Sequence, residues 1–176
     1  MSELIPAYVD GILQPVEKLE VHQRGLRHLA VSVFVMAGNA VLIQRRALSK
    51  YHTPGLWANT CCTHPHWGED AASCALRRLR EELGISGLTM ASVGQVEYRA
   101  SVGVGLTEHE VVDIFVAKAD PDLPLTPDPA EVEATRWIDL ATLSDETRHA
   151  PDRFTPWLRI YLADHHDRIF GSVLGT

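Results

Sequence analysis

Three short groups of residues in the chain could perform chemistry. A thiol and an imidazole lie two positions apart at Cys62 and His64, and two carboxylates lie two positions apart at Glu108 and Glu110. Thiols and carboxyl groups act as acids and bases, whereas imidazoles and carboxylates also bind divalent metals. The third group, residues 77–82, mixes arginines with glutamates, which suits phosphate or a metal–phosphate complex.

The segment 59–66 admits three interpretations. Its cysteines and histidines could form a structural zinc knuckle, although they are closer in sequence than is usual for such sites. Cys62 could be a nucleophile paired with a histidine. Alternatively, the thiol of Cys62 could act as an acid or base while His64 binds a metal. Cys61 and Cys74 are also explained as buried structural cysteines.

The second group lies on an expected strand. Because side chains alternate along a strand, Glu108 and Glu110 share one face and His109 points to the other. A solvated strand end would explain them, but two carboxylates beside an apolar run are costly to bury unless paired or metal-bound. Three imidazoles could join them: His22, His28 and His64. Such donors suit Mn²⁺, Zn²⁺ or Mg²⁺.

The third group lies on an expected helix between residues 70 and 84. Asp70 can cap its start, and Gly84 stands where a C-terminal glycine belongs. Apolar residues recur at helical spacing and predict its buried face: Ala72, Leu76, Leu79 and Leu83. Arg78 and Glu82 are neighbours on one side of this helix. They could belong to a phosphate site, or they could form a surface ion pair worth about 0.3–0.5 kcal/mol.

The elements that must position these groups form a mixed α/β chain. Strands are expected over 30–36, 40–44, 93–100, 107–117 and 136–138, and the first two are joined as a hairpin by Gly38-Asn39. Residues 1–20 are expected to be irregular, and a last helix is expected from Thr155-Pro156 to Gly171. The hairpins argue against a doubly wound parallel sheet.

Composition narrows the class of protein. A chain of 176 residues, 45% hydrophobic and 22% charged, predicts one globular domain. A net charge of -7 has the wrong sign for a generic nucleic-acid binder. No apolar run or signal-peptide pattern predicts membrane insertion or export. Three cysteines, two of them adjacent, argue against a disulfide framework and favour the cytoplasm.

The ordered motifs between Glu17 and Trp157 resemble the type I isopentenyl-diphosphate Δ-isomerases, a family with the Nudix fold. Residues 77–85 resemble the second half of a Nudix box, and Glu69 precedes Arg77 at the Nudix spacing. Thr63 stands where the leading glycine would be, and Arg78 replaces the first glutamate of the pattern. The other matching segments are Lys18-x3-His22, 26–30, 45–50, 54–57, 62–65, 98–100, 108–110 and Pro156-Trp157.

The resemblance implies one Nudix-like α/β (α+β) domain over residues 1–176, a mixed sheet with hairpins sandwiched by helices. Its core would span about 28–170, with residues 1–27 contributing to the site. It implies isomerisation of isopentenyl diphosphate to dimethylallyl diphosphate through a tertiary carbocation, in isoprenoid biosynthesis. Cys62 and Glu110 would be the acid/base residues on opposite sides of the alkene, and Tyr98 would assist protonation.

The resemblance also implies binding roles. One divalent metal, Mn²⁺, Mg²⁺ or Zn²⁺, would be held by His22, His28, His64, Glu108 and Glu110. Glu82 would hold a Mg²⁺ that bridges to the diphosphate. The diphosphate would contact Lys18, Arg46, Lys50 and Arg78, and Trp157 would face the hydrocarbon end. The binding partner would be a small-molecule diphosphate, and neither nucleic acid nor a membrane would be bound. The chain would be a monomer or a weak oligomer.

Two other functions remain open at this point. A Nudix pyrophosphohydrolase would explain Glu69, Glu81 and Glu82, but it leaves the thiol and the paired carboxylates of the strand without a role. Arg78 also counts against it, because a guanidinium replaces a hard oxygen ligand for Mg²⁺. A metal- or diphosphate-binding module without turnover is the third possibility.

Overall fold

A mixed sheet of nine strands forms the centre of the molecule in a computed structural model, which describes residues 3–174. The strands are β1 (Leu4–Val9), β2 (Ile12–Glu17), β3 (Arg27–Ala37), β4 (Ala40–Arg46), β5 (Trp57–Ala58), β6 (Cys61–Thr63), β7 (Met90–Gly103), β8 (Leu106–Lys118) and β9 (Val132–Asp139). The helices are α1 (Lys18–Arg24), α2 (Ala71–Leu83), α3 (Leu140–His149), α4 (Pro156–Asp164) and α5 (His166–Leu174), with a 3-10 turn at Pro151–Arg153.

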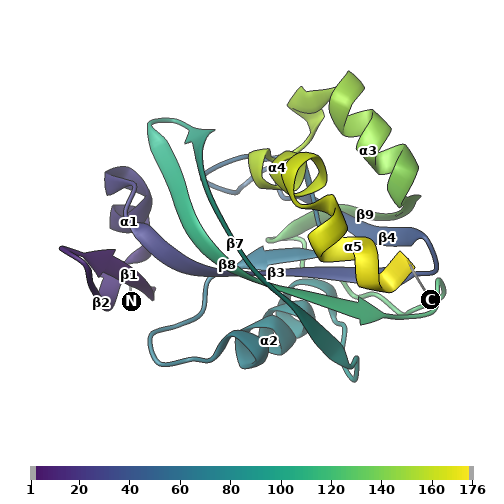
Figure 1. The fold of residues 1–176 in the computed structure, drawn as a ribbon, viewed down its shortest axis with the longest axis horizontal. Coiled ribbons are helices and arrows are strands. Elements are labelled where there is room, and N and C mark those ends of the chain that lie inside the picture. The colour runs from purple at the N-terminus through teal and green to yellow at the C-terminus, as the bar shows by residue number, and fades with distance from the viewer. Residues whose placement is uncertain (1–2, 175–176) are drawn as a thin grey trace.

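Strand β3 connects the groups singled out in the sequence. It pairs in parallel with β8, where His28 faces Glu110, and antiparallel with β6, where Ser32 faces Cys62. Figure 1 shows α2 on one side of the sheet and α4 and α5 on the other, with α1 beside the β7–β8 hairpin. Because helices cover both faces, β3 is buried along most of its length. The expected mixed sheet between helices is confirmed.

The N-terminal expectation is wrong. Residues 4–17 form the β1–β2 hairpin, and α1 follows directly. The turn is Asp10-Gly11, where φ is 52° and 80°. An Asp-Gly pair with positive φ at both residues is a strong hairpin signal, so the pattern was present in the sequence.

The C-terminal half also departs from expectation. Helix α3 was not expected; its N-cap is Asp139, whose side chain accepts from the backbone of Ala141 and Thr142. The prediction of one continuous last helix is wrong, because the helix is interrupted at His165, between α4 and α5. The segment 136–138 is part of the longer strand β9.

Helix α2 has the expected limits, but its buried face only partly matches the expected one, since Ala72 and Leu76 are exposed. Asp70 accepts from the Ser73 amide, and Gly84 ends the helix at φ 69°, where an added Cβ would lie 2.8 Å from Thr126. Leu76 is 47% exposed, whereas Cys74 and Ala75 are buried with Leu79 and Leu83. The Leu76 side chain therefore lies outside the core. This rotation turns Arg78 and Glu82 toward the sheet, where Glu82 meets Gln44 of β4.

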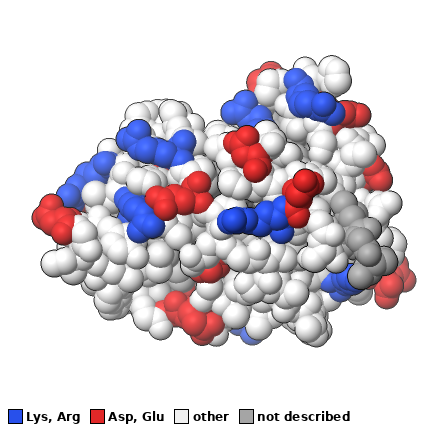
Figure 2. Space-filling model, viewed as in Figure 1, with Lys and Arg blue, Asp and Glu red and all other residues white. Residues whose placement is uncertain are grey.

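The charged side chains do not gather into one continuous surface of a single sign. Figure 2 shows Lys and Arg interspersed with Asp and Glu on the face it views. Among residues 3–174, no helix combines the length and apolar character needed to cross a membrane.

Candidate active site and metal centre

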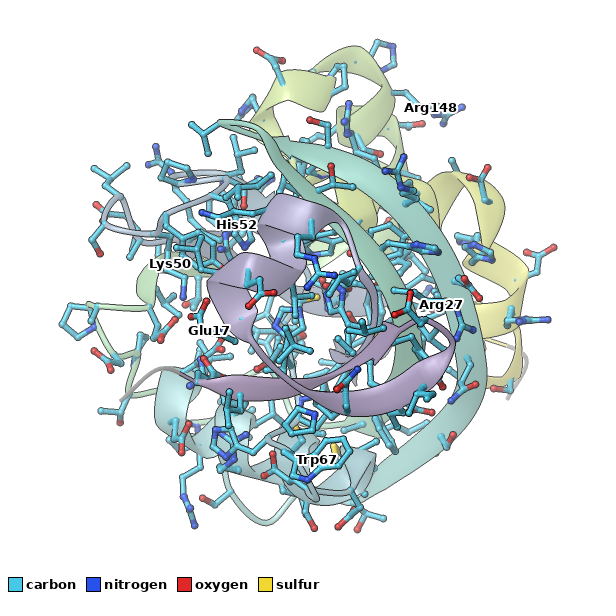
Figure 3. The ribbon with its side chains drawn as sticks, turned by 90° about the vertical axis from the view of Figure 1, so that its left-hand side faces the viewer. Glu17, Arg27, Lys50, His52, Trp67 and Arg148 are labelled. Atoms are coloured by element: carbon cyan, nitrogen blue, oxygen red, sulfur yellow. The ribbon has the colours of Figure 1, made fainter. Side chains whose placement is uncertain are left out.

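One cavity collects most of the residues expected to perform chemistry. Its lining includes side chains from both halves of the chain: Lys18, Arg46, Lys50, Tyr51, His52, Cys62, Thr63, His64, Arg78, Glu82, Glu108, Glu110 and Trp157. Figure 3 looks toward this end of the molecule, with α1 in front and Lys50 and His52 beside it. His22, His28 and Tyr98 contact the cavity residues from behind. The structure therefore brings all the predicted site residues together.

Three imidazoles and a carboxylate form a buried cluster behind the cavity. His22, His28, His64 and Glu110 each offer a donor atom, and these atoms lie within 4.8 Å of one another. The Nδ1 atoms of His22 and His28 are 2.6 and 2.7 Å from the carbonyl oxygens of Lys18 and Leu26. Each ring thus donates from Nδ1 and keeps a lone pair on Nε2.

The arrangement of the Nε2 atoms fits a divalent cation. Nε2 of His22 is buried without a hydrogen-bond partner among the described residues. Nε2 of His64 lies 2.9 Å from Glu110 Oε1 and 3.2 Å from Nε2 of His28. Burial lowers the pKa of His64 well below its usual value, so its ring is neutral. Neutral imidazoles and a carboxylate that converge in this way are a metal-binding donor set.

The paired carboxylates of β8 lie on its inner face, as the strand period predicts. Glu108 and Glu110 are almost completely buried, while His109 faces outward and contacts Glu97. The Tyr98 hydroxyl lies 2.7 Å from Glu108 Oε2 and 2.8 Å from Glu110 Oε2. Burial and the charge of Glu110 raise the pKa of Glu108. Tyr98 is therefore placed to pass a proton between the two carboxyl groups.

Cys62 approaches the same cavity from β6. Its Sγ accepts a hydrogen bond from Ser32 Oγ at 3.2 Å, and Ser32 Oγ lies 3.0 Å from the Tyr161 hydroxyl. Burial, followed by the charge of Glu110, raises the pKa of Cys62 well above its usual value, so the thiol holds its proton at neutral pH. The neighbouring Cys61 points to the other face of β6 and packs with the core under α2. The zinc-knuckle interpretation is therefore wrong.

Basic side chains line the same cavity, and several of them lie next to α2. Arg78 donates to Glu82 at 2.6 Å and lies 3.3 Å from Glu131, which also pairs with Lys50. Gln44 donates to the second oxygen of Glu82 at 2.8 Å and holds that carboxylate in place. The rest of the basic group comes from Arg46, stacked on Trp157, and from Lys18, paired with Glu3.

Two arginine donors beside α2 and β4 are available to an anionic ligand. The Nε–H groups of Arg46 and Arg78 are buried without hydrogen-bond partners among the described residues. Buried donors without partners are costly, so an anionic ligand that accepts from them would be favoured. A carboxylate such as Glu82 beside that anion is suited to Mg²⁺, which is bound through one or two carboxylates plus phosphate oxygens.

Glu69 and Arg77, the other motif residues of the helix, form a separate ion pair outside the cavity. Arg77 donates two hydrogen bonds of 2.7 Å to Glu69. They lower the pKa of Glu69 from 4.5 to about 2, so the pair stabilises the fold fully above pH 4.5 and loses this effect as pH falls toward 2.

We therefore expect Glu69→Gln to destabilise the protein by up to about 1 kcal/mol at pH 7. The difference from wild type should shrink as the pH is lowered from 4.5 toward 2. Denaturant unfolding at pH 7 and at several lower pH values measures this. A deficit of the same size at every pH would show that the charge of Glu69 is not what stabilises the fold.

Several residues around the site escaped the sequence analysis. Ser32 and Tyr161 position the thiol, Gln44 and Glu131 hold the charged groups of α2, and His52 joins the histidine cluster. Ser32 and Gln44 lie within expected strands, where a polar side chain in an apolar run was an available signal. Glu131 and His52 lie outside regular elements, and no spacing rule connects them with the site.

Comparisons with known proteins agree with this geometry. A family model for the NUDIX domain matches residues 26–158. The chain is 71% identical over 173 residues to the isopentenyl-diphosphate Delta-isomerase of Cereibacter sphaeroides, with 98% of each sequence covered. It is 64% identical to the protein of that name from Dinoroseobacter shibae, again with 98% of each covered.

Solved structures share the fold at low sequence identity. DR0079 from Deinococcus radiodurans superposes with a TM-score of 0.72 at 13% identity, covering 91% of this chain and 96% of the other. A MutT NUDIX hydrolase from Burkholderia pseudomallei gives a TM-score of 0.61 at 21% identity, covering 79% of this chain and 98% of the other.

Proposed function

The chain belongs to the NUDIX domain family and, within it, to the isopentenyl-diphosphate Delta-isomerases, and from this premise we propose how its residues perform that reaction. The enzyme isomerises isopentenyl diphosphate to dimethylallyl diphosphate. One observation carries the proposal. A thiol and a carboxyl group, Cys62 and Glu110, line a single cavity that is also lined by Lys18, Arg46, Lys50 and Arg78.

The two proton transfers are assigned to the two sides of this cavity. Moving the double bond requires a proton on the terminal alkene carbon and the loss of a proton from C2, so the protons balance. Cys62 serves one side, and Glu110, connected to Glu108 by the Tyr98 hydroxyl, serves the other. The tertiary carbocation between the two steps is stabilised by nearby π electrons and carboxylates, and Trp157 offers an indole face.

The basic end holds the diphosphate and so fixes the alkene between the two groups. Arg78 and Arg46 have free Nε–H donors for it, and Lys50 and Lys18 add charge. Mg²⁺ held by Glu82 would neutralise part of the diphosphate charge. Burial of Glu110, Tyr98 and Trp157 would keep water away from the hydrocarbon, where it would otherwise capture the carbocation.

A divalent metal would be held by His22, His28, His64, Glu108 and Glu110, and Mn²⁺, Zn²⁺ and Mg²⁺ are the candidates. When bound, it would supply positive charge that increases the acidity of the carboxyl group. Residues 1–27 contribute Lys18 and His22, so the functional domain would be the whole chain and not only the segment 26–158.

Removing the Arg78 guanidinium should weaken diphosphate binding. Losing a charge-assisted hydrogen bond costs about 1.5–3 kcal/mol, or roughly 10- to 100-fold in affinity. We expect Arg78→Gln to show this loss for inorganic diphosphate with Mg²⁺ in titration calorimetry. Arg77→Gln, one residue earlier and outside the cavity, is the control and should bind like wild type. Equal affinities for Arg78→Gln and wild type would make Arg78 a structural partner of Glu82 only.

The reaction itself is tested by incubating the enzyme with isopentenyl diphosphate and Mg²⁺. Proton NMR should show the dimethylallyl isomer, while phosphate release in the same tube stays at background. Phosphate release without the isomer would instead indicate a NUDIX pyrophosphohydrolase.

A further inference from the structure

Two buried hydroxyl groups lie next to the Cys62 thiol, on its side away from the cavity. Ser32 of β3 pairs directly with Cys62 of β6. Its Oγ lies 3.2 Å from Cys62 Sγ and 3.0 Å from the Tyr161 hydroxyl. Ser32 and Tyr161 are completely buried and do not line the cavity, whereas Cys62 does. One side of the sulfur therefore faces these hydroxyl groups, and another faces the cavity.

Helix α4 and two aromatic rings hold the Tyr161 hydroxyl in place. Tyr161 comes about one helical turn after Trp157, which lines the cavity, and both side chains are on the buried face of α4. The Tyr161 ring packs edge-on against Phe34 and against Tyr98, with centroids 5.9 Å apart in each case. The hydroxyl is thus fixed against Ser32 by packing on two sides.

The number of available acceptors fixes the direction of the hydrogen bonds. A hydroxyl group has one proton to donate. Among the described residues, the Tyr161 hydroxyl has no hydrogen-bond partner other than Ser32 Oγ, so its proton goes to that oxygen. The proton of Ser32 is then left for Cys62 Sγ. The chain of donors runs from Tyr161 to Ser32 to the sulfur.

The alternative directions each leave a buried hydroxyl group without an acceptor. If Cys62 donated to Ser32 and Ser32 donated to Tyr161, the proton of Tyr161 would have no acceptor among the described residues. If Cys62 and Tyr161 both donated to Ser32, the proton of Ser32 would have none. A buried donor without a partner is costly, so the direction from Tyr161 to the sulfur is favoured.

This direction determines where the proton of the thiol points. Because Ser32 donates to Sγ, the S–H bond of Cys62 cannot point at Ser32, where two hydrogens would meet. It is left to point toward the cavity that Cys62 lines. When the proton has passed to a substrate, the electron pair of the S–H bond stays on sulfur, and a hydrogen bond to a charged acceptor is stronger than one to a neutral acceptor.

We propose that Tyr161 and Ser32 are positioning residues that aim the S–H bond of Cys62 into the cavity and stabilise the sulfur after it has given up its proton. This rests on the proposed function, which makes Cys62 one of the two acid/base groups. Neither hydroxyl group touches the substrate, and both act through the sulfur.

Neutron diffraction on crystals of the full-length enzyme in D₂O tests the direction of the chain and requires no variant. The deuteron of Tyr161 should lie toward Ser32 Oγ, that of Ser32 toward Cys62 Sγ, and that of Cys62 toward the cavity. A Cys62 deuteron on the line from Sγ to Ser32 Oγ would overturn the proposal.

Variants test whether this arrangement matters for the reaction. Ser32→Ala should lower kcat at least about tenfold, because it removes a hydrogen bond to the charged sulfur. KM and the affinity for inorganic diphosphate with Mg²⁺ should stay at the wild-type values. Tyr161→Phe should show a smaller loss of kcat with the same unchanged KM. A role in packing alone would lower the melting temperature without this split between kcat and KM.

Tyr8→Phe is the matched control, because it removes a tyrosine hydroxyl from β1, where the ring contacts Arg27 outside the cavity. Its kcat and KM should equal those of wild type. A wild-type kcat in folded Ser32→Ala or folded Tyr161→Phe would overturn the proposal. If Ser32→Ala does not fold, Tyr161→Phe and the neutron map decide.

Cys62→Ala separates this proposal from the proposed function. If Cys62→Ala is inactive while Ser32→Ala keeps the wild-type kcat, only the role of the two hydroxyl groups fails. If Cys62→Ala itself keeps its turnover, the acid/base role of Cys62 fails, and the role of Ser32 and Tyr161 in the reaction fails with it.

Discussion

Replacing Cys62 with alanine should lower kcat for isomerisation by at least about 10³-fold. Positioned acid/base groups contribute about 10²–10⁴-fold, and an unactivated alkene or its cation depends on them for every turnover. In the proposed mechanism the thiol is the acid/base group on its side of the cavity, and the hydroxyl groups of Ser32 and Tyr161 position it. Proton NMR with isopentenyl diphosphate measures the rate.

Cys61→Ala is the matched control for this variant. Cys61 is the adjacent thiol, but it packs in the core under α2 and not in the cavity. Cys61→Ala should lower the free energy of unfolding and leave kcat close to the wild-type value. Cys62→Ala should in turn keep its melting temperature and its affinity for inorganic diphosphate. Substantial turnover in a folded Cys62→Ala protein would remove Cys62 from the reaction.

Replacing Glu110 with glutamine should have a comparable effect on rate and a second effect on metal content. The amide cannot donate or accept the transferred proton, and it replaces a charged side chain, the proposed metal ligand, that contacts His64 at 2.9 Å. Changes to partners outside the ligand set cost 10- to 100-fold in metal affinity, so loss of a direct ligand should exceed about 100-fold. Activity assays and competition titration with Zn²⁺ measure the two effects.

His109→Asn is the control on the same strand. Its side chain points to the opposite face of β8 and contacts Glu97, so rate and metal affinity should both stay near wild type. Lost activity with unchanged metal affinity in Glu110→Gln would leave Glu108 as the carboxylate ligand and restrict Glu110 to proton transfer.

The sequence predicts the site best where it lies on regular strands. Side chains alternate between the two faces of a strand, which places Glu108 and Glu110 on the same face of β8. The same alternation puts Cys61 and Cys62 on opposite faces of β6. The parallel pairing of β3 with β8 is what brings His28 opposite Glu110. That pairing depends on the whole sheet, so motif spacing alone could not predict it.

His52 and Glu131 were missed for a different reason. Each lies outside the regular elements, so no helix or strand period predicts where its side chain points. Thr53 adopts a positive φ directly after His52, and Glu131 pairs with Arg78 of α2 and with Lys50 of the loop after β4. Helical periodicity predicted only half of the buried face of α2. Leu79 and Leu83 are buried as expected, but Ala72 and Leu76 are exposed, and the smaller Cys74 and Ala75 pack in their place.

Arg78 explains how a NUDIX fold can favour isomerisation over hydrolysis. Where the Nudix pattern has a glutamate, this chain has a guanidinium paired with Glu82. One oxygen ligand fewer is available to hold Mg²⁺ and activate water, and one more cation is available to hold the diphosphate. In the proposed mechanism the thiol and the carboxyl group act on the hydrocarbon instead.

Isomerisation in D₂O tests the central claim most directly, because the proposed acid/base groups of the enzyme exchange their protons with solvent before they transfer them. NMR of the product should show deuterium in a methyl group of dimethylallyl diphosphate, formed without free phosphate. Product whose new methyl group carries no solvent deuterium, or phosphate in place of product, would contradict acid/base transfer by Cys62 and Glu110.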